Sequence, residues 1–447
     1  MIRKSPAAQW TGVLILFLVY GNAFVDRQIL GLLIAPIRAD LHITDTGFSV
    51  LIGFAFALFY ALFGLPIGRW VDRGDRSIIL ASGVALWSVF TCMCGLSRHF
   101  LQLFLCRMGV GVGEATVVPV TYSLLADYFP PKRRGLALGL FGSGVYFGLG
   151  AAMLAGGPLV SAFESVGTVD LPILGVLHPW QAALIVVGLP GIALSLLALR
   201  LAEPRRNSRR TAPVGAQDSA QCVTAGAAWR YYRRAGLAIS LHHLTVAFMA
   251  MALYAVLAWA PEHFRRTFGV TPAHAAPWIG TVILVTGTLG VLTGGIVSDF
   301  LTQRNVKAAR LRVLLVASLL ALPASWFFAF GTSSAMALAG LGGIILCVST
   351  LTSVGAAGVQ ELLPPTMRGQ GAALFQLVVN LLALSVGPAL VAAVTDYVFN
   401  DDQKLASALG VTLPFMLLMA ALLAGAGLKS YAKVGRMLAS INSWDGA

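Results

Sequence analysis

Twelve long apolar runs, separated by short polar stretches, fill most of the chain. Each run has roughly 20 residues or more, the length at which a helix rising about 1.5 Å per residue crosses a bilayer core of ~30 Å. Hydrophobic residues make up 57% of the 447 positions and charged residues only 11%, unlike a water-soluble domain. We therefore predict an all-α membrane protein. Its twelve transmembrane helices are predicted at residues 8–35, 47–69, 77–97, 100–129, 136–163, 181–201, 235–265, 276–300, 311–330, 334–361, 368–396 and 407–428.

Basic residues fall mainly in one set of alternate loops, and few lie in the other set. Loops rich in Lys and Arg stay in the cytoplasm, and an even number of helices leaves both chain ends on one side. Both termini are therefore predicted to be cytoplasmic, in a multi-pass protein of the cell (inner) membrane. The same loops account for the formal net charge of +13, so no nucleic-acid partner is needed to explain it.

The two halves of the chain repeat the same motifs. Residues 202–234, rich in Arg, Pro, Gly, Gln and Ser, separate six predicted helices from six. The segment 130–135 (PPKRRG) matches 364–369 (PPTMRG), and Asp127 corresponds to Glu361 in the same register. The predicted domains are an N-terminal six-helix bundle (1–201), a cytoplasmic linker (202–234), a C-terminal six-helix bundle (235–428) and a cytoplasmic tail (429–447).

Two charged residues interrupt the fourth predicted helix, and two more interrupt the first. Arg107 and Glu114 are seven residues apart, so two helical turns place them on one face. A charge inside the bilayer is costly, so such residues face a partner or a water-filled cavity. Counting from the helix centres, Asp26 and Arg107 both lie roughly 5–10 Å to the outer side of the midplane, and Glu114 lies near it. Asp26 and Arg107 are therefore expected to be able to pair, and Arg27 follows Asp26 directly.

Each of these charges has two interpretations. Asp26 is a candidate proton carrier, because an arginine that moves toward or away from it would switch its proton affinity. Alternatively, Asp26 forms a permanent salt bridge with Arg107 or Arg27 that locks helix packing. Glu114 is a candidate substrate contact or second proton site, or else a polar group bonded to a neighbouring helix. Arg107 is the preferred ligand for an anionic headgroup, and Arg27 is a second candidate or a structural partner.

Other polar and aromatic residues could surround this site. Gln376 and Asn380 share one face of the eleventh helix and either line a cavity or bond across helices. His242 and His243 lie in the inner part of the seventh helix, as a proton site or as partly solvated residues. Three glycine pairs are expected at sliding contacts between the halves: 64/68, 144/148 and 290/294. Seven aromatic residues could form an amphipathic wall, or simply pack: Phe24, Phe56, Tyr60, Tyr122, Tyr146, Tyr254 and Trp259.

Several of these motifs resemble those of a known family. Residues 68–76 (GRWVDRGDR) resemble the loop signature between the second and third helices of the major facilitator superfamily, although Asp75 stands where that family usually has Gly. Arg107 with Gly111 and Gly113 resembles the fourth-helix motif of its proton-coupled members. The resemblance implies two pseudo-symmetric six-helix bundles that work by alternating access. It also implies a cytoplasmic gate of inter-domain salt bridges, made from Asp72, Arg73, Arg76, Asp127, Arg134, Asp299, Glu361 and Arg368.

A narrower resemblance lies in the first helix. Asn22, Asp26 and Arg27, followed by Gly31, resemble the first helix of Spinster-type transporters, and Arg107 with Glu114 also fits that group. The Spinster family includes carriers of sphingosine-1-phosphate and of lysophospholipids, so the resemblance implies a small amphiphilic substrate.

The expected function is therefore a proton-coupled secondary active transporter that exports a lipid-like substrate as a monomer. The alternatives are an organic-anion/proton symporter, a multidrug/proton antiporter, or a passive channel or scaffold. The chain has no phosphate-cradling loop, zinc-protease motif or nucleophile elbow, so no enzyme activity, cofactor or metal is expected. Proton coupling is assigned to Asp26 and Glu114. The expected substrate-binding residues are Asn22, Arg27, Arg107, Glu114, Tyr122, Gln376 and Asn380.

Overall fold

The computed structural model describes residues 6–171, 175–203, 225–364 and 367–444. The chain divides into two compact units, and each is described separately here. Unit 1 takes Met1–Asn207, Leu257–Leu284 and Thr395–Leu405, and unit 2 takes Ser208–Val256, Val285–Val394 and Ala406–Ala447. The predicted linker falls largely on residues 204–224, which lie outside the described part of the chain.

Twelve stretches of the described residues are helical, long enough and apolar enough to cross a bilayer. They confirm the predicted all-α fold with twelve transmembrane helices, and most ends agree with the prediction to within a few residues. The last stretch is longer than predicted. The stretches are Ala8–Leu32, Asp45–Val71, Arg76–Cys94, Phe100–Tyr128, Leu136–Val166, Pro179–Ala198, Tyr231–Phe268, Pro272–Gln303, Ala309–Phe330, Ser334–Leu362, Leu374–Phe399 and Asp402–Leu438.

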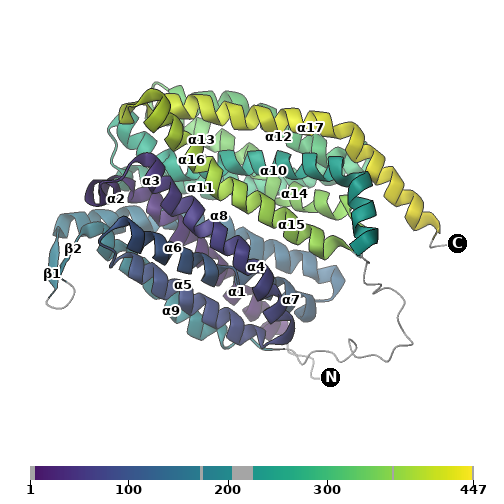
Figure 1. Ribbon diagram of the computed structural model, residues 1–447, viewed down its shortest axis with the longest axis horizontal. Coiled ribbons are helices and arrows are strands. Elements are labelled where there is room, and N and C mark those ends of the chain that lie inside the picture. Colours follow the sequence, from purple (N-terminus) through teal and green to yellow (C-terminus); the bar gives the residue numbers. More distant parts are fainter. Residues whose placement is uncertain (1–5, 172–174, 204–224, 365–366, 445–447) are drawn as a thin grey trace. The chain divides into compact units, whose positions relative to one another are not determined.

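In unit 1, α5 packs along α6 and α9, and α1 packs along α8 (Figure 1). The second span is built from α3, the π-helical turn η2 and α4, and the fourth from α6 and α7. A short antiparallel hairpin, β1–β2, precedes α9; its three-residue strands are too short to be predicted from residue periodicity. The elements are α1 (Pro6–Gln28), η1 (Ile29–Leu32), α2 (Ile34–Leu41), α3 (Asp45–Ser49), η2 (Val50–Phe54), α4 (Ala55–Arg73), α5 (Arg76–Cys94), α6 (Phe100–Glu114), α7 (Val117–Tyr128), α8 (Pro131–Val166), β1 (Val169–Leu171), β2 (Gly175–Leu177) and α9 (Pro179–Ala198).

In unit 2, α12 packs against α13 and α14, and α14 packs against α15 (Figure 1). Two helices, α10 and α11, contribute their residues 257–268 and 272–284 to unit 1 and the rest to unit 2. The elements of the second half of the chain are α10 (Ala225–Phe268), α11 (Pro272–Gln303), α12 (Ala309–Phe330), α13 (Ser334–Val348), α14 (Thr350–Leu362), α15 (Arg368–Leu381), η5 (Leu382–Val386), α16 (Gly387–Ala393), η6 (Val394–Phe399), η7 (Asp402–Lys404) and α17 (Leu405–Trp444).

The fourth and tenth spans break at equivalent positions. The register that aligns Asp127 with Glu361 also aligns Thr116, at the junction of α6 and α7, with Thr350, at the junction of α13 and α14. In both places the threonine hydroxyl donates a 2.8 Å hydrogen bond to the carbonyl three residues earlier, Gly113 in one case and Cys347 in the other. The internal repeat therefore extends to the local chemistry of the helix break.

Asp75, the residue that departs from the family signature, starts a helix. Its carboxylate accepts hydrogen bonds from the backbone N–H groups of Ser77 and Ile78, at 2.9 and 3.1 Å, and so caps α5. The Ser77 hydroxyl donates a further bond of 2.6 Å. This hydroxyl and the backbone donors lower the pKa of Asp75 below its ordinary value. The carboxylate thus replaces the usual glycine with a side chain that stabilises the first turn.

Glycines allow close helix contacts, but these lie within the units. A side chain at Gly148 would collide with the backbone of Gly21 on α1, and one at Gly290 with the backbone of Leu346 on α13. Gly64 has open space around it. The expectation that the three glycine pairs form sliding contacts between the halves is therefore wrong for the contacts found at 148 and 290. The reason is that backbone-to-backbone approach here serves packing within one bundle.

Candidate functional site

Four charged residues gather inside unit 1. Asp26, Arg107 and Glu114 are almost completely buried, with 1%, 2% and 1% of their surface exposed. Arg27 keeps 14% of its side chain exposed. Helix α1 supplies Asp26 and Arg27, and α6 supplies Arg107 and, as its last residue, Glu114. The charges found in two distant parts of the sequence thus form one buried cluster, which we call the charged core.

The ion pair in the charged core joins different residues from those expected. Arg27 pairs with Glu114, donating from Nε to Oε2 at 2.7 Å and making a second, shorter contact through Nη2. Among the described residues, no ion pair joins Asp26 to Arg107, so the expected pairing of these two is wrong for this structure. Depth estimates compare positions along the helix axes but do not show which side chains point toward one another. Arg27, considered above as either a ligand or a structural partner, is the residue that reaches the carboxylate of Glu114.

Aromatic rings surround the guanidinium of Arg27. Its Cζ lies 4.7, 4.4 and 5.4 Å from the ring centres of Phe24, Phe56 and Tyr60. Cζ of Arg107 lies 5.6 Å from the ring of Phe56. Each ring face attracts a cation, so the three rings hold Arg27 without neutralising it. Three of the seven aromatic residues considered for an amphipathic wall therefore lie at the charged core.

Several buried polar atoms in the charged core and in the residues next to it have no hydrogen-bond partner. They are Asn22 Nδ2, Asp26 Oδ1, Trp87 Nε1, Arg107 Nε and Glu114 Oε1. Buried polar groups are normally paired, so these unpaired atoms could each accept a partner from a water or a ligand. Asn22, expected among the substrate-binding residues, thus lies one turn before Asp26 with a free donor.

Two residues of α5 were missed in the sequence. Thr91 Oγ1 lies 3.5 Å from Asp26 Oδ2, and the indole of Trp87 also faces Asp26. Their spacing of four residues, with polar atoms on one face of an apolar helix, was a usable signal.

The other expected substrate-binding residues lie elsewhere. Tyr122 is 55% exposed on α7, and Gln376 and Asn380 belong to α15 of unit 2, exposed and half-buried respectively.

Two of the expected gate residues of unit 1, Arg76 and Asp127, lie in one network, in which Arg76 is buried and the carboxylates are partly exposed. Its Nη1 donates to Asp127 at 2.6 Å, and its Nε and Nη2 donate to Glu203 at 2.9 and 2.7 Å. Glu203 was not anticipated, although it is an acid directly after the sixth span. Arg134 donates to the carbonyl of Ala126, and Arg73 is exposed. The side chain of Asp72 lies outside the described residues.

In unit 2 the counterpart network is smaller. Arg310, near the start of α12, pairs with Glu361 at 3.3 Å, and Tyr431 donates a 3.0 Å hydrogen bond to the same carboxylate. Arg310 and Tyr431 were not predicted. Asp299 is exposed, and the side chain of Arg368 lies outside the described residues.

A second buried ionic cluster lies at the opposite end of unit 1. Asp45 is fully buried and pairs with Arg38 at 2.7 Å and with Arg266 at 2.7 Å. Arg266 also pairs with Glu262 at 2.5 Å, and Arg38 pairs with Asp402 at 2.9 Å. We call these five residues the outer cluster. Sequence reasoning missed it because these residues sit at helix ends, where charges are common; Glu262, at the end of a predicted span, was the available signal.

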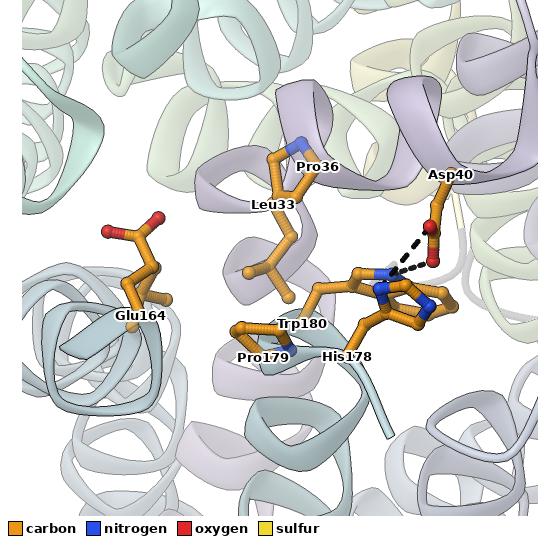
Figure 2. A pocket seen from close by; sticks show the side chains of 8 residues that line it. Leu33, Pro36, Asp40, Glu164, His178, Pro179 and Trp180 are labelled. Atoms are coloured by element: carbon orange, nitrogen blue, oxygen red, sulfur yellow. Dashed lines mark hydrogen bonds and ion pairs between the residues drawn. The ribbon is translucent and has the colours of Figure 1, made fainter. Parts of the chain in front are cut away.

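A small cavity of about 120 Å³ lies in unit 1, apart from the charged core. Figure 2 shows His178 and Trp180 beside Asp40, with Glu164 across the cavity. Trp180 Nε1 donates to Asp40 at 2.8 Å, and His178 Nδ1 lies 3.4 Å from the same carboxylate. None of the predicted site residues lines this cavity.

Comparison with known proteins agrees with this architecture. A family model described as Major Facilitator Superfamily matches residues 16–388. An MFS-type efflux pump of Mycolicibacterium smegmatis is 30% identical over 94% of this chain and 91% of its own length. A probable galactarate/D-glucarate transporter of Bacillus subtilis is 25% identical over 93% of each chain.

A solved structure is also similar. The bacterial homologue of the human lysosomal transporter Spinster, in its inward-facing and occupied conformation, superposes with a TM-score of 0.73. It is 25% identical, and the match covers 95% of this chain and 96% of the other. These matches also confirm the resemblance to the Spinster group that the first helix suggested. The chain is therefore a multi-pass membrane transporter, not an enzyme, and belongs to the major facilitator superfamily.

Proposed function

We propose that this transporter exports an amphiphilic substrate in exchange for protons, and that the charged core is its binding and coupling site. The observation that carries the proposal is the buried Arg27–Glu114 ion pair with Asp26 and Arg107 in the same cluster. Ionisable residues at membrane depth are rare, and they mark substrate or proton pathways by default.

The second half of the chain supports a functional role for these charges. In the register that aligns the two helix breaks, Leu341 and Val348 occupy the positions of Arg107 and Glu114, and both are fully buried. The same broken span is thus built without charges in unit 2. The fold does not require Arg107 and Glu114. The free energy that it costs to bury these charges in unit 1 is therefore better explained by a role in transport.

The ion pair suggests the kind of headgroup that the site accepts. A zwitterionic headgroup with a phosphate and an amine would insert between Arg27 and Glu114 and give each charge a new partner. The forked donors of arginine suit phosphate oxygens, and Arg107 lies close enough in the core to add further donors. No charge is then left unpaired in the membrane, which would otherwise be costly. Sphingosine-1-phosphate and amine-bearing lysophospholipids have such headgroups.

The surrounding rings suit the rest of such a molecule. Phe24, Phe56 and Tyr60 present apolar faces beside Arg27, so a headgroup at the ion pair leaves its tail next to aromatic surface. We assign Asn22 to the headgroup and Tyr122 to the tail. Gln376 and Asn380 are proposed as contacts from unit 2.

Protons would compete with the amine for Glu114. When Glu114 is protonated it no longer attracts an ammonium group, so acid weakens the binding of a zwitterion. By linkage, binding of the zwitterion releases the proton, which is the behaviour of an exchanger. Asp26, with an unpaired oxygen and Arg107 nearby, is proposed as the carrier that takes a proton in one state and releases it in another.

A second candidate function follows from the sugar-acid relative. A purely anionic substrate would take Arg27 and leave Glu114 alone, so Glu114 would have to bind a proton at the same time. Acid would then strengthen binding, and the protein would be an organic-anion/proton symporter. The two candidates therefore predict opposite pH dependence at the same residue.

The networks at the two ends of unit 1 fit alternating access. We propose that the Arg76 network, with Asp72, Arg73, Asp127, Arg134, Asp299, Glu361 and Arg368, closes the cytoplasmic side, in an inner membrane with both termini cytoplasmic. The outer cluster, which joins Asp45 to Arg266, would close the other side. The outer cluster neutralises Asp45 and Arg266 only while their helices are together, so it favours one closed end. The Arg76 network links helices of one six-helix half, and its proposed role is to hold the ends of α5 and α7 in position for closure.

The test uses the purified protein with sphingosine-1-phosphate, its deaminated analogue and D-glucarate as probes. Binding is measured about one pH unit above and below neutrality. We expect acid to weaken sphingosine-1-phosphate binding, and Glu114→Gln to weaken that ligand more than the deaminated analogue. Stronger binding of D-glucarate in acid, with no binding of the lipid, would replace the exchanger with the symporter.

Arginine substitutions refine the same test. Arg27→Lys and Arg107→Lys keep the charge but lose the fork, so each should weaken phosphate recognition on the order of tenfold. The control is Arg200→Lys, because Arg200 is exposed and has no assigned role in the binding site or the gate. Equal weakening by all three variants would contradict a headgroup role for Arg27 and Arg107.

A further inference from the structure

Two adjacent histidines lie buried in unit 2 without hydrogen bonds. His242 and His243, on α10, have 0% and 5% of their surface exposed. All four ring nitrogens lack a hydrogen-bond partner of normal geometry, and the nearest acceptor for His243 is the carbonyl of Ile239 one turn before. The expectation that these residues are partly solvated is therefore wrong. A neutral imidazole has one donor and one acceptor, and leaving both unpaired in a buried site is unfavourable.

Three other helices contact the ring of His242, and a fourth acts on it through charge. On α14, a Cβ at Gly358 would collide with its Nε2, so the ring lies directly against the backbone of that helix. The rings of Phe375 on α15 and Tyr431 on α17 lie 5.8 and 6.1 Å away, centre to centre. The charge of Arg310, on α12, also acts on His242. The unpaired nitrogens therefore do not result from loose packing.

The same neighbours form the ionic network of unit 2. Tyr431 donates to Glu361 and also lies 3.4 Å from the carbonyl of Gly358, the residue against which His242 packs. Glu361 pairs with Arg310, which in turn donates to the carbonyl of Ala357. The titratable or charged groups around His242 are thus His243 on α10, Arg310 on α12, Glu361 on α14 and Tyr431 on α17; the contact from α15 is Phe375.

We propose that His242 is a proton-binding site of unit 2, and that its protonation opens the network formed by Arg310, Glu361 and Tyr431. A protonated imidazole has two donors and a charge, and it needs an acceptor. Glu361 is the one carboxylate in the described surroundings, and it is already engaged by Tyr431 and Arg310. The proton is therefore accommodated only when Glu361 turns to the ring or water enters. Either change breaks the Tyr431–Glu361 hydrogen bond.

Acid would consequently select a different state of this end of unit 2. A ligand shifts an equilibrium by its difference in affinity for the two states, and here the ligand is the proton. The site is independent of the proposed role of Asp26, because the two residues belong to different units. It would act on α14 and α17 with no substrate and no pH gradient present.

Hydrogen–deuterium exchange of the full-length purified protein tests this site. Backbone exchange is measured at about pH 4 and about pH 7.5, so that the acid arm lies well below the usual histidine range, and is corrected for the intrinsic effect of pH. We expect peptides covering residues 354–362 and 427–434 to exchange on the order of threefold faster in acid. His242→Gln should remove this difference. His263→Gln, a buried histidine of the same helix that contacts Thr267, should retain it.

Two further measurements keep the proposal falsifiable if His242→Gln does not fold. Tyr431→Phe should exchange rapidly at both pH values, because the bond that protonation breaks is already absent. In the wild type, exchange of the imidazole C2 hydrogen reports the titration of His242, and its midpoint should coincide with that of the two peptides. Equal exchange of the wild type at both pH values, non-coincident midpoints or a retained difference in His242→Gln would each overturn the proposal. A pH response that is retained in Asp26→Asn separates this site from the proposed coupling site.

Discussion

Units 1 and 2 are built from the same repeated span but bury different chemistry. In unit 1 the fourth span carries Arg107 and Glu114; in unit 2 the tenth span carries Leu341 and Val348 at the same places. Both spans break after these positions with the same threonine-to-carbonyl bond. The difference teaches that the break belongs to the fold, whereas the charges are an addition to it. Unit 2 instead buries two histidines, which are neutral until they bind a proton.

The largest effect is expected when Glu114 of unit 1 is replaced by valine, the residue at the aligned position 348 of unit 2. Glu114→Val should remove the carboxylate that pairs with Arg27, abolish transport and destabilise the protein by about 3 kcal/mol. The free energy of unfolding is measured in detergent, and transport in reconstituted vesicles. Arg27→Leu in the same chain should recover most of the stability but none of the transport. A double variant as unstable as Glu114→Val would mean that the two residues are not coupled.

Asp26→Asn removes the negative charge of α1 and leaves both partners of the Arg27–Glu114 ion pair in place. We expect the protein to fold and bind substrate, while transport loses its dependence on the pH gradient. The matched control is Thr91→Val, which removes the 3.5 Å neighbour of Asp26 but leaves the carboxylate. It should change the rate by a few-fold at most. Gradient-driven transport that persists in Asp26→Asn would remove Asp26 from the proposed mechanism.

Helix spacing gives a third contrast between the units. Gly113 aligns with Cys347 in unit 2, so only unit 1 needs a glycine at this position. A Cβ at Gly113 would lie 2.7 Å from the carbonyl oxygen of Gly83 and 2.7 Å from the backbone nitrogen of Trp87. Gly113→Ala should therefore cost about 1–3 kcal/mol of unfolding free energy. Gly64→Ala, where nothing lies within 4 Å, is the control and should cost much less.

The smallest expected effect concerns the cap of α5. Asp75→Ala should lower stability by about 1 kcal/mol, and Asp75→Gly by only a few tenths. The pKa of Asp75 is lowered in the folded state, so its carboxylate stabilises the fold above the unfolded-state pKa. That contribution is lost as the pH falls through the lowered folded-state value. Thermal unfolding of wild type and Asp75→Ala should therefore converge in strong acid; a constant gap would contradict the cap.

The fold was largely predictable because it depends on the length of the apolar segments and on the repeat between the two halves. Both properties can be read directly from the order of residues. The twelve spans and the correspondence of Asp127 with Glu361 needed no tertiary information. Side-chain pairing was not predictable in this way. Asp26 and Arg107 have suitable depths, yet Arg27 is the residue that meets Glu114, because the direction of a side chain around its helix axis decides the contact.

The residues that were missed share a different cause. Trp87 and Thr91 place polar atoms on one face of an apolar helix, but the sequence does not show that this face meets Asp26. Glu203, Arg310 and Tyr431 sit at helix ends, where charged and aromatic residues are common. Their roles arise from helices brought together by the fold, and one sequence gives no measure of that proximity.

The glycine contact between α5 and α6 has a consequence for how such a transporter can change its cargo. Gly83 and Gly113 fix the spacing of these helices through backbone atoms. The backbone position of Glu114, next to Gly113, therefore does not depend on which side chains lie nearby. Phe24, Phe56 and Tyr60 place their rings around the guanidinium of Arg27. Substitutions at the three aromatic positions can therefore change the substrate range while the two glycines are retained. A library randomised at these three positions should yield folded proteins with new preferences far more often than one randomised at Gly83 and Gly113.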